Sequence, residues 1–432
     1  MDRLPSTHNT PRARVAGILL NLLLCAAALT LTQRAIAQDV PPPVTPAPVE
    51  APAPAPTTTT PPVTEPVVTA TPVAPPPPVE ELPPAEPVVE APPEAPKPLS
   101  IGAWAHLGTY LNGPDSKVNR VAADGELDLL FSADLIDGFG MTANLVGYYG
   151  PGATDGYGPH AGGINIMDLH GKITIDDAFN IWVGRMLVPS DRANFSGYWF
   201  AAPWFYPGQH FAGPPVGPRQ GPQGRNDGIT VWGQAAGGLF KYYAGAYNLQ
   251  NTSGTALFSG RLNLSLLSPE PGYYHSSTYY GAKDVLAIGI GGQYQKDGSP
   301  AMEPDDYAEF NADILFEKNF GAGGVLDLEG AFYKYMGDGE LVDHSFLVLA
   351  SWMTAEKIGV GKIQPLVRFQ SAKTTDVGSM TIPPDETSNI FEGQIGYVID
   401  SYATRFALGF LYQKAGDAIE DTQLYLGLQL QK

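Results

Sequence analysis

Basic residues are scarce in this chain, and they never gather into a run. Of its 432 residues, 25 are Lys or Arg and 44 are Asp or Glu, so the formal net charge is −19. Nucleic-acid binding needs a basic patch that neutralises phosphates, and the composition gives no support for that function. A mean hydropathy of −0.09 also argues against a bundle of membrane-spanning helices.

Cysteine occurs once, at Cys25. It lies in the apolar stretch 15–31, which follows three arginines and precedes the small-residue sequence Ala35-Ile36-Ala37. This order is typical of a secretory signal peptide over residues 1–37, with an uncleaved anchor helix as the alternative. Cleavage after Ala37 would remove the cysteine, so the mature protein could form no disulfide, which is compatible with an oxidising periplasm or cell surface.

The chain also lacks the residue patterns of an enzyme or a metal centre. Its seven histidines show no metal-ligand spacing. Ser196 and Ser259 lack the flanking glycine of a nucleophile elbow, and the glycine-rich stretch 289–292 lacks the Lys-Ser/Thr of a phosphate-binding loop. We therefore expect no catalytic activity and no cofactor, and we interpret those glycines as small residues on crowded strands.

Residues 38–98 are rich in proline, alanine and acidic residues. Such a composition cannot bury a core and should stay extended, partly as polyproline II. We predict a periplasmic linker, which is either a solvated spacer or a tether that contacts peptidoglycan or a periplasmic partner.

Alternation of apolar and polar residues begins near Leu99 and continues to the end of the chain. The run 423–430 shows it best, because every second residue is leucine. A period of two is typical of a strand with one face in each environment. The pattern predicts sixteen strands near 100–111, 122–133, 139–150, 164–176, 178–187, 226–236, 238–249, 256–268, 283–296, 307–318, 324–336, 342–355, 361–373, 388–399, 402–415 and 421–431.

The connections between these strands alternate between short and long, and only 268–282 is long where a short turn is expected. Charged residues stand at alternate positions inside strands such as 122–133 and 307–318, so one face needs water. We predict an all-β fold over 99–432, a closed antiparallel transmembrane barrel with a water-filled lumen. Aromatics near strand ends, including Tyr148 and Trp182, should form an interfacial girdle, unless they reflect ordinary strand enrichment.

The longest connection, 188–225, follows the fifth strand and is rich in aromatic residues, proline and glycine. Loops of this length are usually functional, and so apolar a loop should fold inward against the barrel wall.

In this layout the chain resembles bacterial outer-membrane porins. The segments 182–194 and 426–431 look like parts of the phosphate-selective porin family. The resemblance implies the fold, a pore and a homotrimer in outer-membrane lipid. The chain departs from this family in two ways. Its carboxyl end, Gln431-Lys432, has no aromatic residue, which bears on assembly. It is also short of lysine, so phosphate selectivity is not carried over from the family.

Charges expected on the lumen face are segregated along the chain, and opposed charges across a narrow pore would order water and favour polar solutes. The alternative is that they are scattered, solvated side chains. In the loop, Asp191 and Arg192 could instead form an ion pair that fixes its first residues. The wall candidates are Lys172, Arg185, Lys241, Arg261, Glu309, Asp313, Glu317, Asp327, Glu329, Arg368 and Arg405, and the loop candidates are Asp191, Arg192, Arg219, Arg225 and Asp227.

These observations predict an outer-membrane porin for passive diffusion of small hydrophilic solutes, sized by the loop 188–225. One alternative is a channel specific for an anion or a sugar, whose rings the aromatic loop could stack. The other is a non-conducting surface or envelope-anchoring barrel.

Overall fold

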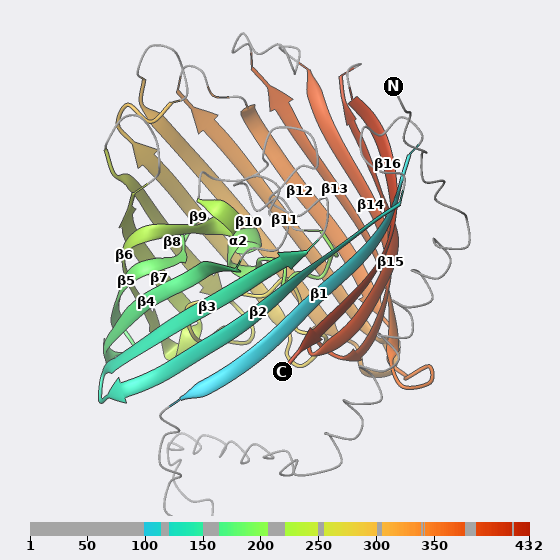
Figure 1. The fold of residues 1–432 in the computed structure, drawn as a ribbon, viewed down its shortest axis with the longest axis horizontal. Coiled ribbons are helices and arrows are strands. Elements are labelled where there is room, and N and C mark those ends of the chain that lie inside the picture. The colour runs from blue at the N-terminus through green and yellow to red at the C-terminus, as the bar shows by residue number, and fades with distance from the viewer. Residues whose placement is uncertain are drawn as a thin grey trace, which may run out of the picture. The chain divides into compact units, whose positions relative to one another are not determined.

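The strands of the chain close into one antiparallel barrel. In the computed structural model, residues 99–113, 121–149, 164–205, 221–248, 255–299, 305–337, 340, 342–375, 386–416 and 419–432 are described. Each strand pairs with its neighbours in sequence, and β1 (Ser100–Asn112) pairs with β16 (Ile419–Gln431) to complete the ring (Figure 1). Closure satisfies the backbone of every strand and leaves no open edge.

The predicted strand number is confirmed, and the largest boundary differences are at Ile136, predicted at 133, and at Ser265, predicted at 268. The other strands are β2 (Val121–Ile136), β3 (Phe139–Tyr149), β4 (Ile164–Asp176), β5 (Phe179–Leu187), β6 (Arg225–Ala235), β7 (Phe240–Tyr247), β8 (Leu257–Ser265), β9 (Val285–Gln295), β10 (Tyr307–Asn319), β11 (Val325–Met336), β12 (Val342–Met353), β13 (Lys362–Thr374), β14 (Thr387–Asp400) and β15 (Thr404–Ala415).

Helical structure in the described residues is limited to short pieces. The α-helix α2 (Arg192–Ser196) follows β5, and single 3₁₀ turns lie at Pro222–Gly224, Ala236–Gly238 and Gly321–Gly323. Within the described ranges, no helix is both long and apolar enough to cross a bilayer.

The two faces of the wall have opposite chemistry, as the alternation predicted. On β8, Leu262 and Leu264 are exposed on the outer face, whereas Arg261 and Asn263 are buried on the inner face. A lipid-facing Arg or Lys at the bilayer midplane costs roughly 2–4 kcal/mol, so this register is strongly preferred over one shifted by a residue.

The predicted aromatic girdle is wrong for several of its members. Tyr148, Trp182 and Tyr243 are buried on the inner face, because the strand alternation gives them the parity of the lumen-facing residues. Trp182 and Tyr243 belong to a buried cluster that also contains Phe195 of α2. These rings therefore serve the packing of the lumen.

The predicted signal peptide (1–37) and linker (38–98) lie outside the described residues, and both stay predictions.

Candidate functional site: a lumen narrowed by two inward-folded segments

The chain that leaves β5 turns into the barrel at once. Residues 188–205, named here the constriction loop, include α2, which lies inside the ring of strands (Figure 1). Its first residues lie against β8 and β9, where Ser259 Oγ donates to the Pro189 carbonyl at 3.0 Å. Gly291 on β9 permits this contact, because a Cβ there would lie 2.7 Å from the Ser190 oxygen. These contacts hold residues 188–205 of the predicted loop 188–225 against inner-face residues, and the inward fold of the whole loop stays a prediction.

Polar contacts of Asp191 and Arg192 fix the loop to the next strands. The Asp191 carboxylate accepts from Tyr333 on β11 at 2.6 Å, and the Arg192 backbone N–H donates to Asp313 on β10 at 3.2 Å. Burial raises the pKa of Asp191, and the Tyr333 hydrogen bond opposes that rise. The direct Asp191–Arg192 pair considered from the sequence is replaced by these longer-range contacts.

The second half of the constriction loop reaches the opposite side of the lumen. The Trp199 carbonyl accepts from Gln429 at 3.0 Å, and the Ala202 carbonyl accepts from Arg405 at 3.0 Å. Trp204 stacks on His106 of β1 with ring centroids 3.6 Å apart. On β16, Gly427 leaves the space that the Trp204 indole fills. The loop therefore spans the lumen from β8–β11 to the β1–β16 seam.

A second segment enters the lumen from the other end of the barrel. Residues 266–284, named here the inner turn segment, join β8 to β9, and the sequence marks them only as an unexpectedly long turn. Glu270, Tyr273, His275 and Thr278 in this segment are all buried. Its backbone is held by Lys241 on β7, which donates to the Gly272 carbonyl at 3.0 Å.

Carboxylates on β10 and β11 receive the far half of the inner turn segment. Glu317 accepts from Thr278 Oγ1 and from the Gly281 N–H, each at 2.7 Å. Glu329 accepts from Ser277 Oγ at 2.5 Å. The sequence signal for this docking was the excess of inward-facing acids on β10 and β11, which need donors once they are buried.

The two inward-folded segments are joined by a buried ion pair. Arg192 donates to both oxygens of Glu270 at 2.9 Å, and both side chains are at most 1% exposed. The Ser277 N–H also donates to the Phe200 carbonyl at 2.9 Å. Burial alone would raise the pKa of Glu270, but the Arg192 charge and hydrogen bonds hold it well below the ordinary 4.5. Glu270 is therefore ionised, as a bidentate Arg–carboxylate pair requires.

His275 lies beside this pair without adding a charge to it. Its Nδ1 is 3.6 Å from Glu270, and its Nε2 is 3.3 Å from the Tyr243 hydroxyl. Burial lowers the pKa of His275 well below 6.5, and the Lys241 charge lowers it further.

Most of the predicted lumen charges lie on the inner face, but they contact each other or the inward segments. Arg261 binds Asp313 at 2.5 and 2.8 Å across Gly289, and Arg368 binds Glu392 at 2.6 Å. The predicted transverse field across an open lumen is therefore wrong for Arg261, Asp313 and Arg368, because each meets an opposite charge directly. Other predicted residues in the same buried inner-face positions are Lys241, Glu309, Glu317, Asp327, Glu329 and Arg405.

Two predicted site residues face away from the lumen. Arg185 on β5 and Asp227 on β6 form a bidentate pair at 2.8 Å on the outer face, with side chains 33% and 54% exposed. The assignment of Arg185 to the lumen is wrong because it is an odd number of residues from the inward-facing Trp182. Asp227 belongs to β6 rather than to the constriction loop.

The remaining candidates occupy the β4 side of the lumen. Arg225 begins β6 and binds Asp168 on β4 at 3.3 Å. Lys172 on β4 lies 4.8 Å from the centroid of the Trp182 ring. Arg219 lies outside the described residues.

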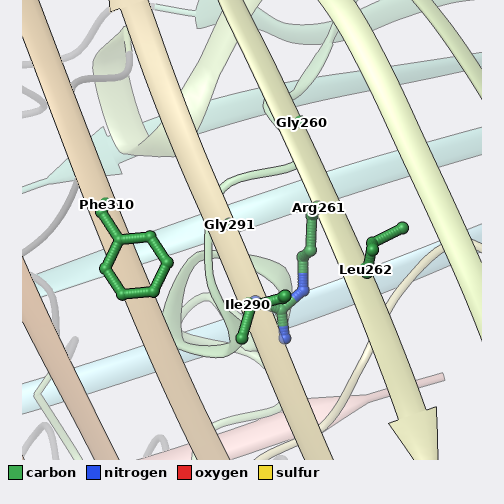
Figure 2. A pocket seen from close by; sticks show the side chains of 6 residues that line it. All are labelled: Gly260, Arg261, Leu262, Ile290, Gly291 and Phe310. Carbon is green, nitrogen blue, oxygen red and sulfur yellow. The ribbon is translucent and has the colours of Figure 1, made fainter.

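A shallow groove on the outer wall shares one residue, Arg261, with this site. Its volume is about 160 Å³, and Leu262, Ile290 and Phe310 line it, all of them exposed on the outer face (Figure 2). In the described part of the chain, no group of three or more His, Cys, Asp or Glu side chains could hold a metal ion.

Comparison with known proteins supports the barrel fold. No protein-family profile and no curated protein sequence matches the chain. Among solved structures, Pseudomonas putida OprB at high pH is similar with a TM-score of 0.53 at 12% identity, over 77% of this chain and 94% of OprB. Salmonella typhi OmpF in complex with daunomycin has a TM-score of 0.51 at 9% identity, over 77% of this chain and 97% of OmpF. At these identities the likeness establishes a shared barrel fold.

Proposed function

We propose that this protein is an outer-membrane channel for passive diffusion of small hydrophilic solutes. The observation that carries the proposal is the division of the sixteen-stranded wall into an apolar outer face and a polar inner face. An outer face of exposed leucine, isoleucine and phenylalanine fits acyl chains, and sixteen strands enclose more space than wall side chains alone can fill.

The constriction loop and the inner turn segment set the width of that channel. Both carry buried polar groups that bind the wall, so they act as fixed parts of the lumen. We also propose that the barrel lies in the outer membrane as a homotrimer, with the 38–98 linker in the periplasm as a spacer or as a tether to peptidoglycan. The porin resemblance supports these points.

A channel specific for one class of solute, an anion or a sugar, is the second candidate. The observation that favours it is the burial of nearly all described inner-face side chains from β7 to β16, which indicates a narrow path. The loop aromatics argue against sugar stacking at Trp199 and Trp204, because Trp199 packs on Trp104, with centroids 5.3 Å apart, and Trp204 on His106.

Planar-bilayer recording of the purified full-length mature protein tests the proposal. Ohmic steps that grow with salt concentration are expected for a diffusion channel. Conductance that saturates with one solute would favour the specific channel. Silence of protein whose heat-modifiable gel migration shows a folded barrel would contradict the channel function and favour an anchoring barrel.

A further inference from the structure

The inner faces of different strands differ in their access to solvent. On β8 every inner-face side chain is buried, and on β10 and β14 every one is buried except the strand-end residues Asn319 and Asp400. On β2, by contrast, Asp124, Glu126, Leu130 and Ser132 are half-buried inner-face residues, although they lie inside the strand and away from its ends. Solvent therefore reaches the lumen wall along β2.

The contacts of the two inward segments explain this difference. The constriction loop and the inner turn segment bind β7–β11, β14–β16 and β1. On β3 and β4, the same connections contribute Gln223 with Tyr148, at 2.6 Å, Arg225 with Asp168, and Tyr274 beside Asp168. On β2, Tyr198 of the constriction loop lies beside Glu126. Central inner-face residues of β3 and β4, such as Asn144 and His170, are buried, so the inner face of β2 is the side that the described parts of these segments leave partly exposed.

The uncovered side is acidic. Asp124, Glu126 and Asp128 occupy alternate positions of β2, so their carboxylates point to the lumen at intervals of roughly 6–7 Å. Asp168 on β4 lies nearby and is neutralised by Arg225. The other cation on this side, Lys172, lies over the Trp182 ring.

Oxygen atoms on this wall also have unused hydrogen-bonding capacity. Asp128 is 1% exposed, and its Oδ2 accepts from Asn144 Nδ2 at 2.9 Å. Among the described residues, Asp128 Oδ1, Asn144 Oδ1 and Glu126 Oε1 are buried atoms with no hydrogen-bond partner. Buried acceptors without donors are costly, and a cation close to them removes that cost. Carboxylate and amide oxygens are the ligands that small hard cations prefer.

We propose that the conducting path follows the inner face of β2, and that Glu126 and Asp128, together with Asp124, make it selective for small cations over anions. This inference rests on the proposed channel function and assigns its selectivity to residues that the sequence alone did not single out. Carboxylates beside a narrow, low-dielectric passage raise the local cation concentration and exclude anions.

Reversal potentials in a KCl gradient test the selectivity. The E126Q/D128N double variant should lower the K⁺ over Cl⁻ permeability ratio by at least about threefold. The matched control is E309Q/D327N, which makes the same two chemical changes on β10 and β11, where Glu309 Oε1 and Asp327 Oδ1 also lack hydrogen-bond partners. Both control side chains are buried, whereas Glu126 on β2 is half-buried. The control should leave the ratio unchanged. Heat-modifiable migration of each variant shows whether it has folded.

Thiol modification tests the location of the path independently of charge. In a Cys25→Ser background, Ser132→Cys on β2 should react with a small charged methanethiosulfonate, and the reaction should lower conductance. Ser351→Cys on β12 should not react, because Ser351 is 3% exposed on the inner face.

Three results would overturn the inference. The first is a wild-type channel that is unselective or selective for anions. The second is an equal loss of selectivity in the two double variants. The third is a faster thiol reaction at position 351 than at position 132. In each case a conducting protein would leave the channel function standing. Folded protein that stays silent in every recording would contradict the channel function, and this inference with it.

Discussion

Two pairs of charged groups occupy equivalent inner-face positions of the same barrel, yet their surroundings differ. The first pair is Arg261 with Asp313, and the second is Glu126 with Asp128. The first two bind each other under the constriction loop, which they help to hold. Of the second two, Glu126 is half-buried on β2, and Asp128 is buried beside it and accepts from Asn144. A charge joined to an opposite charge contributes little field to a passing solute, whereas uncompensated carboxylates beside water act on it directly. Inner-face charge in this barrel therefore has two roles, attachment of inward segments and lining of the path.

The largest change in conductance should come from deleting the inner turn segment, which covers one side of the lumen wall. Ser268 N–H donates to the Asp284 carbonyl at 3.1 Å, so the strands are close enough to be joined there by a two-residue turn. Replacing 269–283 by Asn-Gly should raise single-channel conductance severalfold and weaken cation selectivity, because water would reach a second face of the wall. Shortening 355–360, a turn at the same end with exposed Ile358 and Val360, is the control and should change neither quantity.

Removing one partner of the buried ion pair should destabilise the barrel strongly. In Arg192→Ala, Glu270 would keep a buried charge without its partner, and the free energy of unfolding should fall by about 3–5 kcal/mol. Arg185→Ala removes the same side chain from a part-exposed pair on the outer face and should cost at most about 1 kcal/mol. Guanidinium titrations in detergent micelles compare the two. Equal losses would mean that the buried pair has no special structural role.

A single methyl group tests how closely the constriction loop fits the wall. A Cβ at Gly427 would overlap the Trp204 indole, whereas a Cβ at Gly171 on β4 meets nothing within 4 Å. Gly427→Ala should therefore lower stability by about 1–3 kcal/mol and displace Trp204, and Gly171→Ala should do neither. Tryptophan fluorescence and unfolding midpoints report both effects. An undisturbed Gly427→Ala spectrum would contradict the described packing.

The smallest predicted effect is a pH dependence of the inner turn segment. His275 has a folded pKa below its unfolded value of 6.5, so the unfolded state binds its proton first. Stability should therefore fall with decreasing pH below about 6.5, by up to about 1.4 kcal/mol per pH unit, and His275→Gln should reduce that slope. Glu270 also has a lowered pKa and acts in the same direction, but its contribution to stability is lost only as the pH falls below the ordinary value of 4.5, outside the range in which His275 acts. Unfolding free energies of the two proteins between pH 7.5 and 5 measure the difference, and identical slopes would contradict burial of a neutral His275.

The sequence predicted the barrel well because the strand period is a local property. The alternation around Leu262 and Leu264 reports a face directly, and both residues lie where it placed them. The site was harder to predict because its contacts join distant parts of the chain. Arg192 and Glu270 are 78 residues apart, and Asp191 and Tyr333 are 142 apart. Pattern alone could not show that the turn 268–282 enters the lumen.

Residues that were assigned to the wrong face of their strand account for the misplaced candidates. The sequence places Arg185 inward by its charge and Trp182 in the girdle by its ring, and the structure reverses both, so that they still lie on opposite faces of β5. Glu126 and Asp128 were assigned to the inner face, but nothing in the sequence distinguished them from Glu309 or Asp327. The distinction depends on which walls the inward segments cover.

The contact of Trp204 with both sides of the β1–β16 seam has a consequence for biogenesis. The first and last strands of a barrel become neighbours only when the ring closes. Trp204 contacts His106 on the first strand and lies against Gly427 on the last. We therefore expect this indole to reach its final packing only once β1 and β16 have paired.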